Sequence, residues 1–227
     1  MDRFKIKISK SCGLILLCLC FKVSAQNLGA KLGAVTQLHG EVTFFPFHLP
    51  NKLKHLQVND ILNEKGSYLT YEDSFMTVKL FDGSFLRLSP KSKFSLEFNA
   101  SQKIYTLHLF TGSIKILFSQ KLSAGKAEKL IVKSGDTEIE TTEGKFSVVA
   151  NPVMDLVNCY VEKGLVSVIS LSQGERKDFA YVHRNETVSV EESNHDVSVP
   201  RKISDKELQF LHGSSYLKLE KGEETSP

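Results

Sequence analysis

The stretch that decides the fold runs from Met76 to Leu88 and reads MTVKLFDGSFLRL. Apolar and polar residues alternate on both sides of Asp82-Gly83, which is typical of two strands joined by a tight turn. A two-residue turn at Asp82-Gly83 would place Val78 opposite Arg87 and would mix apolar and charged side chains on one face. The stretch is therefore predicted to form a β-hairpin with a longer turn.

A three-residue turn of Phe81, Asp82 and Gly83 separates the two faces. Gly83 then lies at positive φ, which glycine adopts at no steric cost. Burial of one face sets the register of a strand pair, because a shift by one residue would turn every side chain to the other face. The predicted register has three pairs: Val78 with Leu86, Met76 with Leu88, and Thr77 with Arg87.

The residues of this turn are predicted to serve the architecture. Asp82 and Ser84 are turn formers whose side chains hydrogen-bond nearby backbone groups. Arg87 is predicted on the face opposite Leu86 and Leu88. Truncation of Arg87 to alanine is expected to lower stability if that face is covered, and to leave it nearly unchanged if the face is wet.

Outward from this hairpin, many short segments of alternating or β-branched character are separated by turn residues. The predicted strands are 34–37, 41–47, 67–71, 74–81, 84–88, 93–98, 103–110, 113–118, 129–134, 136–141, 145–150, 155–162, 165–171, 178–183 and 186–191. A helix start is predicted only at Ser204 to Glu207. The predicted fold class is all-β, with irregularly stacked hairpins that form a sandwich or a solenoid-like β module.

The pattern of strand, two residues, glycine and strand occurs twice more. It is found in residues 109–116, LFTGSIKI, and in residues 161–168, VEKGLVSV. Gly112 and Gly164 are therefore predicted as further structural turns. The spacing between the three glycines is not constant, so the pattern does not indicate a strict solenoid repeat.

The N-terminus resembles a secretory signal peptide. Basic residues precede the apolar run Ser11 to Phe21, and Val23-Ser24-Ala25 offers a cleavage site before Gln26. The run is too short for a transmembrane helix, which needs roughly 20 apolar residues, so no stable membrane span is predicted after cleavage. An uncleaved signal anchor is the alternative. The predicted organisation is a signal peptide at 1–25, a β domain at 26–192, and a C-terminal extension with a short helix and a polar tail at 193–227.

Charge and cysteine content exclude several classes of protein. Beyond residue 25 the chain has 24 basic and 25 acidic residues, a balance that lacks the basic surface typical of nucleic-acid binding. Cys159 is the one cysteine in that part of the sequence, so it cannot form an internal disulfide. It is predicted to lie in the core, because buried cysteine behaves as a small hydrophobic residue.

Catalytic, cofactor-binding and metal sites are all predicted to be absent. The seven histidines do not stand at metal-ligand spacings, and the mature chain lacks cysteine pairs for thiolate sites. Ser84 and Ser113 each follow a glycine, but neither lies in a nucleophile elbow between a strand and a helix. We therefore expect a protein that is not an enzyme and that needs no cofactor.

The densest aromatic cluster consists of Phe44, Phe45 and Phe47. In a strand over 41–47, the alternation of side chains cannot bury both Phe44 and Phe45 on one face. The cluster is predicted either to pack in the core or to form an exposed apolar edge for a protein or glycan partner.

Three segments of the chain resemble the FecR domain, the periplasmic module of the ferric-citrate regulator family: 56–62, 74–92 and 107–116. The densest likeness is the block LFDGSFLRLSPKS at residues 80–92. Residues 140–148 and 162–168 are similar to the later strands and the closing hairpin of the family, with Lys145 where the family would have threonine.

This resemblance implies an exported FecR-like module of the cell envelope that acts by protein interaction or signalling. The ferric-citrate regulators carry a cytoplasmic anti-sigma segment and a transmembrane helix before the module, whereas residues 1–10 precede the short apolar run here. Direct regulation of a cytoplasmic sigma factor is therefore not expected. The expected partner is an envelope protein or a cell-wall component, and the expected location is the periplasm, with secretion or surface exposure as alternatives. A peptidoglycan- or polysaccharide-binding β module is the alternative function.

Overall fold

The protein, seen in a computed structural model, is described over residues 30–49, 51–119 and 127–213. The signal peptide predicted at 1–25 and the end of the predicted tail lie outside these residues. Within them one helix, α2 (Asp205–Gly213), follows a long series of strands. The strands are β1 (Lys31–His39), β2 (Val42–Pro46), β3 (Lys54–His55), β4 (Ile61–Asn63), β5 (Gly66–Thr70), β6 (Phe75–Leu80), β7 (Phe85–Leu88), β8 (Lys93–Asn99), β9 (Ile104–Ser119), β10 (Lys129–Ser134), β11 (Thr137–Thr141), β12 (Glu143–Asn151), β13 (Leu156–Gly164), β14 (Val166–Ser172), β15 (Glu175–Val182), β16 (Glu186–Glu191), β17 (Asp196–Val197) and β18 (Arg201–Lys202).

The strands form two sheets that share β9. Sheet A has the order β4-β1-β6-β7-β9-β12-β13-β16, and the short β17 and β18 both pair with β16. Sheet B has the order β3-β2-β5-β8-β9-β10-β11-β14-β15. Residues 104–111 of β9 pair within sheet B, and residues 112–119 pair within sheet A. The β9–β10 ladder is parallel and every other ladder in the described chain is antiparallel.

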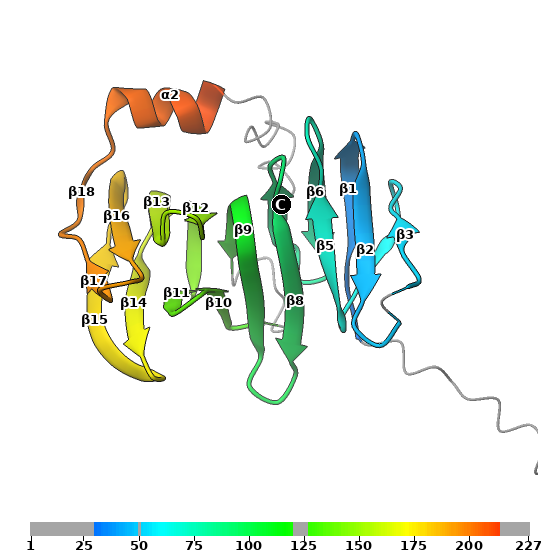
Figure 1. The fold of residues 1–227 in the computed structure, drawn as a ribbon, viewed down its shortest axis with the longest axis horizontal. Coiled ribbons are helices and arrows are strands. Elements are labelled where there is room, and N and C mark those ends of the chain that lie inside the picture. The colour runs from blue at the N-terminus through cyan, green and yellow to red at the C-terminus, as the bar shows by residue number, and fades with distance from the viewer. Residues whose placement is uncertain (1–29, 50, 120–126, 214–227) are drawn as a thin grey trace, which may run out of the picture.

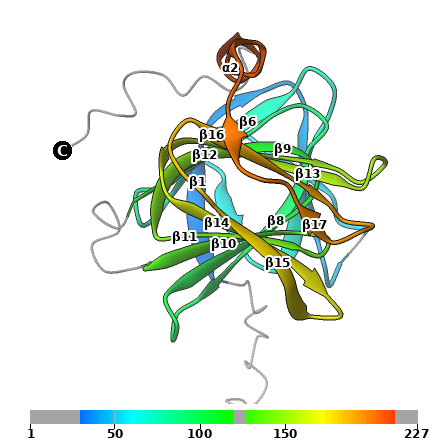
Figure 2. The ribbon, with the colours of Figure 1, turned by 90° about the vertical axis from the view of Figure 1, so that its left-hand side faces the viewer.

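The two sheets face each other as layers, and the hydrophobic core lies between them. Figure 1 shows the strands side by side along the molecule, and Figure 2 shows the two layers with α2 above sheet A. Successive side chains in a strand point to opposite faces, so each strand contributes every second residue to the core. Val78 and Leu86 of sheet A and Leu107 and Val132 of sheet B belong to one buried cluster. The predicted all-β class is confirmed.

The predicted strands agree with the structure except at one junction. Residues 103–110 and 113–118, predicted as two strands, form the single long strand β9. The prediction that Cys159 is a core residue is confirmed, since its side chain is buried in β13. Burial raises the pKa of the Cys159 thiol to about 12, so the thiol stays protonated and unreactive at neutral pH.

The predicted helix start is confirmed at α2. The backbone N–H of Glu207 donates to Ser204 Oγ at 3.4 Å, and the backbone N–H of Ser204 donates to Glu207 Oε2 at 2.8 Å. This reciprocal pattern is a capping box, which satisfies backbone donors that the first turn of a helix leaves without partners. Leu208 and Leu211 of α2 pack with Ile203 and with Tyr160 of β13, so the helix lies against the outer face of sheet A.

Candidate interaction surfaces

The β6–β7 hairpin has the predicted three-residue turn. Gly83 lies at φ 92°, and its N–H donates to the carbonyl of Leu80 at 2.9 Å. The N–H of Leu80 donates to the carbonyl of Ser84 at 2.8 Å and closes the turn. The ladder contains the three predicted pairs: Val78 with Leu86, Met76 with Leu88, and Thr77 with Arg87. The predicted register is therefore confirmed.

Asp82 and Ser84 hold this turn from within. Asp82 is buried, and its Oδ1 accepts a hydrogen bond from the backbone N–H of Ser84 at 2.8 Å. The hydroxyl of Ser84, also buried, donates to Asp82 Oδ2 at 3.1 Å. A carboxylate that accepts two hydrogen bonds at a turn fixes the local backbone, because it satisfies groups that the ladder leaves without partners.

Arg87 lies on the outer face of sheet A, opposite the core. Its side chain is only 4% exposed, and its guanidinium carbon lies 4.8 Å from the centre of the Phe75 ring. A cation over an aromatic ring is attracted by the negative face of the ring, and the attraction is stronger where water is excluded. The face that carries Arg87 is therefore covered, contrary to the solvated face that a sandwich strand commonly presents.

Arg87 is part of a polar row that crosses sheet A from strand to strand and is buried except at the half-buried Tyr160. Consecutive pairs in the ladders align its members: Thr77, Arg87, Lys115, Ser147, Tyr160 and Thr187. The side chain of Lys115 is 2% exposed, and its Nζ lies 2.6 Å from Glu162 Oε1. Lys145 Nζ lies 3.6 Å from the other oxygen of Glu162. Two cations thus share one largely buried carboxylate.

The environment of Lys115 disfavours its positive charge. Burial lowers the pKa of Lys115, and the nearby charges of Lys145 and Arg87 lower it further, whereas the ion pair with Glu162 raises it. Sequence reasoning missed this group. The sequence feature that indicates this group is Lys115 between two apolar residues, Ile114 and Ile116. Only the three-dimensional structure shows that Glu162 is the acidic residue that lies next to Lys115.

Gly112 and Gly164 differ from the predicted hairpin turns. Gly112 lies inside β9 where the strand passes from sheet B to sheet A, and Gly164 ends β13 in sheet A just before β14 in sheet B. Both lie at positive φ, 90° and 91°. A Cβ on Gly112 would lie 2.3 Å from Ser92 Oγ and 2.7 Å from the carbonyl oxygen of Lys91. These glycines allow the chain to cross between layers at a point of close approach.

The predicted aromatic cluster is divided between two environments. Phe44 packs against the core, with its ring centre 4.8 Å from that of Tyr68. Phe45 is half-buried opposite Ser67. Phe47 is 52% exposed and lines a hollow on the outer face of sheet B.

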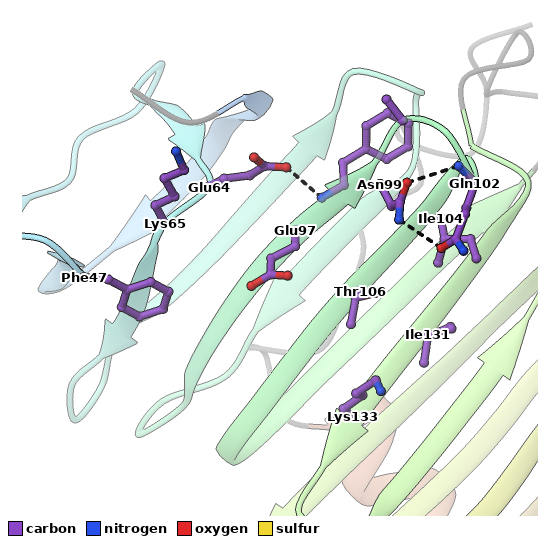
Figure 3. A pocket seen from close by; sticks show the side chains of 12 residues that line it. Phe47, Glu64, Lys65, Glu97, Asn99, Gln102, Ile104, Thr106, Ile131 and Lys133 are labelled. Atoms are coloured by element: carbon purple, nitrogen blue, oxygen red, sulfur yellow. Dashed lines mark hydrogen bonds between the residues drawn. The ribbon is translucent and has the colours of Figure 1, made fainter. Parts of the chain in front are cut away.

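This hollow has a volume of about 770 Å³ and spans strands from β8 to β10 (Figure 3). Glu97 and Thr106 lie between Phe47 at one side of the hollow and Gln102 and Ile131 at the other. The lining of the hollow combines an aromatic ring, aliphatic side chains, amides and carboxylates. Such a surface can bind a partner through both apolar contacts and hydrogen bonds. The predictions from the sequence did not include it, since it is formed by residues from distant segments.

Two of the polar side chains at the hollow support the fold. The carboxylate of Glu64 accepts hydrogen bonds from the backbone N–H groups of Phe98 at 2.8 Å and Ala30 at 3.2 Å. Asn99 Oδ1 accepts from the backbone N–H of Gln102 at 3.1 Å, and Asn99 Nδ2 donates to Gln102 Oε1 at 2.9 Å. These bonds pre-form the rim of the hollow.

The described ranges contain no group of three or more His, Cys, Asp or Glu side chains that could hold a metal ion. No helix within those residues is long and apolar enough to cross a membrane.

Residues 67–167 match the family model described as FecR protein, which confirms the predicted resemblance. The chain is also similar to two crystal structures of a candidate anti-sigma factor from Parabacteroides distasonis, with TM-scores of 0.53 and 0.52 and identities of 14% and 15%. Each match covers 65% of this chain and spans 64% or 65% of the other chain. At that identity the likeness shows the fold alone. No curated protein matches the chain.

Proposed function

We propose that the chain is an exported, non-enzymatic FecR module of the cell envelope that acts in signalling by binding another protein. Support comes from the FecR match over residues 67–167. The similar structures are described as candidate anti-sigma factors, a name for proteins that act on another protein. The N-terminal sequence supports export, with a signal peptide at 1–25, a β domain at 26–192 and an extension at 193–227.

The observation that carries this proposal is the outer face of sheet B. In the described residues α2 lies against sheet A, whereas sheet B presents an open hollow that is lined by the exposed ring of Phe47 at one side and by Thr106 and Ile131. Exposed aromatic residues in a concave, mixed surface are typical of protein-binding sites. We assign the partner surface to this hollow.

A matched pair of variants tests the surface. Phe47→Asp places a charge in the hollow, and Val153→Asp makes the same kind of change at a side chain that is 93% exposed and lies outside the hollow. In a pull-down from envelope fractions, we expect Phe47→Asp to lose the partner protein and Val153→Asp to retain it. Equal capture by both variants would move the partner surface elsewhere.

Export is tested separately by mass spectrometry of the envelope fraction. We expect a mature N-terminus at Gln26, because small residues precede it. An intact Met1 on a membrane-bound form would favour the signal-anchor alternative.

The hollow also supports a second candidate function, binding to peptidoglycan or another polysaccharide. The hollow is lined by an exposed aromatic ring, Phe47, by the carboxylate of Glu97 and by the amide of Gln102, which together offer stacking and hydrogen bonding to a sugar. Purified peptidoglycan sacculi separate the two functions. Sedimentation of the protein with sacculi, reversed by Phe47→Asp, favours polysaccharide binding, and its absence favours the protein partner.

A further inference from the structure

Strand β15 forms one edge of sheet B, at the opposite end of the molecule from β2 and β3 (Figure 1). In the described part of the chain it forms a ladder only with β14. The strand at the other edge of this sheet, β3, has two residues, whereas β15 has eight. An edge strand of this length offers backbone N–H and carbonyl groups to a further strand unless something blocks them.

The hydrogen bonds of β14 show which backbone groups of β15 are open. The N–H of Leu171 in β14 donates to the carbonyl of Asp136, on the side away from β15. Backbone groups of successive residues point to alternate sides of a strand, so in this register those of Phe179 and Tyr181 point away from β14. The N–H of Phe179 accordingly donates to a side chain, Asp178 Oδ1, at 2.8 Å.

Charge protects only the first half of this edge. Residues 175–177 read ERK, and the register with β14 shifts at Lys177, which forms a bulge. Charged side chains and bulges are common protections of edge strands. The second half, residues 179–182, reads FAYV and has no charged side chain. Phe179 is 46% exposed and Tyr181 is 55% exposed, so this half is an open and partly aromatic edge.

The open half is complementary to a second copy of itself in the antiparallel direction. With Ala180 on the twofold axis, Phe179 of each copy lies opposite Tyr181 of the other. These two residues exchange both of their backbone hydrogen bonds, because their groups point outward. The two Ala180 residues form the closer pair, with Cα atoms about 4.5 Å apart, where a small side chain fits. Aromatic pairs across two strands add to the stability of such a ladder.

Neighbouring registers lose these contacts. A register with Phe179 opposite itself sets Tyr181 opposite Lys177, where the bulge interrupts the strand. A register with Tyr181 opposite itself requires the N–H of His183, which already donates to a carboxylate at 3.0 Å. The register centred on Ala180 avoids both costs.

We propose that β15 is a dimerisation edge, at which two copies of this chain pair antiparallel through residues 178–182 and join their B sheets. The rings of Phe179 and Tyr181, which contact each other edge to face at 5.6 Å, form the outer side of the contact. So short a ladder buries less than the roughly 800 Å² per partner of a stable interface, so the dimer is weak and reversible. Strands β11 and β14 separate this edge from the hollow, so the inference goes beyond the proposed function and is tested separately.

Sedimentation equilibrium of the purified chain tests dimerisation. We expect the mass to rise with concentration from that of one chain toward that of two. Tyr181→Pro removes an N–H that the ladder with β14 does not use, so we expect this variant to keep its fold and to lose the dimer. Tyr181→Phe keeps both the N–H and a ring, and should dimerise like the wild type. A wild-type chain that stays monomeric up to about 1 mM would overturn the proposal. A folded Tyr181→Pro variant that dimerises like the wild type would overturn it as well.

Disulfide trapping tests the register and does not depend on the proline variant. In Ala180→Cys the two Cα atoms lie within the range of about 4.4–6.8 Å that a disulfide spans, so we expect rapid dimer formation under mild oxidation. In the control Lys177→Cys the two cysteines lie roughly 20 Å apart in this register, at about 3.3 Å per residue, and should not cross-link. Cys159 is buried and is common to both variants. Equal yields from the two variants, or no dimer from Ala180→Cys, would overturn the proposal.

Discussion

The outer faces of the two sheets have similar sequence patterns and opposite environments. On sheet A, the row from Thr77 through Arg87 and Lys115 to Ser147 is buried. On sheet B, the corresponding polar and apolar positions Thr106 and Ile131 are half-buried or line an open hollow. Alternation along a strand indicates which residues face the core, but it does not indicate what covers the other face. The comparison predicts that equivalent changes have larger effects on sheet A.

The largest difference is expected for two ion-paired glutamates. Glu162→Ala would leave Lys115 buried without its carboxylate, and we expect a loss of about 3–5 kcal/mol in the free energy of unfolding. Glu140→Ala removes the partner of Lys129, 2.7 Å away at the surface of sheet B, and should cost about 1 kcal/mol or less. Urea denaturation measures both. Equal losses would mean that the outer face of sheet A is solvated.

The next effect concerns the glycine at which β9 changes sheets. Gly112→Ala places a Cβ at positive φ and 2.3 Å from Ser92 Oγ, so we expect a loss of more than about 2 kcal/mol. Gly174→Ala, in the β14–β15 turn of sheet B, has the same sign of φ but no atom within 4 Å of the new Cβ. It should cost only the backbone strain, about 1 kcal/mol. Thermal melts of the two variants compare them, and similar losses would contradict the close approach at Gly112.

Two arginines that lie over aromatic rings allow the buried and the exposed environment to be compared for the same kind of contact. Arg87 lies 4.8 Å from the Phe75 ring on the covered face, and Arg176 lies 3.6 Å from the Phe179 ring on exposed β15. We expect Arg87→Ala to cost about 2 kcal/mol and Arg176→Ala about 0.5–1 kcal/mol, because the attraction is stronger without water. The measurement is again the free energy of unfolding. A larger loss at Arg176 would mean that distance outweighs burial.

The hairpin turn of sheet A gives a smaller effect. Gly83 lies at φ 92°, where β-branched residues are strongly disfavoured. Gly83→Val should therefore lower the free energy of unfolding by more than about 1 kcal/mol. Gly83→Asn is the matched control and should cost less, because asparagine tolerates positive φ. If the valine variant melts like the wild type, the strain at this turn is absent.

The smallest effect depends on pH and arises where the two layers meet. Glu192, just after β16 of sheet A, accepts a hydrogen bond from the hydroxyl of Thr137 in sheet B at 3.3 Å. Burial raises the pKa of Glu192, and the charges of Asp136 and Asp155 raise it further. Its ionised form therefore costs stability above the folded-state pKa, and this cost is absent at a pH below the ordinary value of 4.5.

Glu192→Gln keeps the shape and the acceptor while it removes the charge. We expect the variant to melt at a slightly higher temperature than the wild type at about pH 7, and at the same temperature below about pH 4. Thermal melts across this range provide the test. A variant that is less stable at about pH 7 would show that the charge strengthens the contact between the layers.

Local patterns were sufficient for most of the secondary structure. The turn at Phe81 to Gly83, its register and the helix cap at Ser204 all depend on residues close together in the chain, so local sterics and hydrogen bonding decide them. The two-residue and three-residue strands, such as β3 and β17, were not predicted. They are too short to show a period, and they exist because a neighbouring strand offers partners.

The sequence by itself determined the all-β class, the positions of the longer strands, the face of the β6–β7 hairpin that enters the core and the burial of Cys159. These features follow from alternation and from steric limits on the backbone. Only the tertiary structure decided that Gly112 lies inside one strand that crosses between layers, that Phe47 lines a hollow, and that Lys115 shares Glu162 with Lys145. These features join residues from strands far apart in the chain, and a one-dimensional pattern has no information on which strands become neighbours or on what covers a sheet.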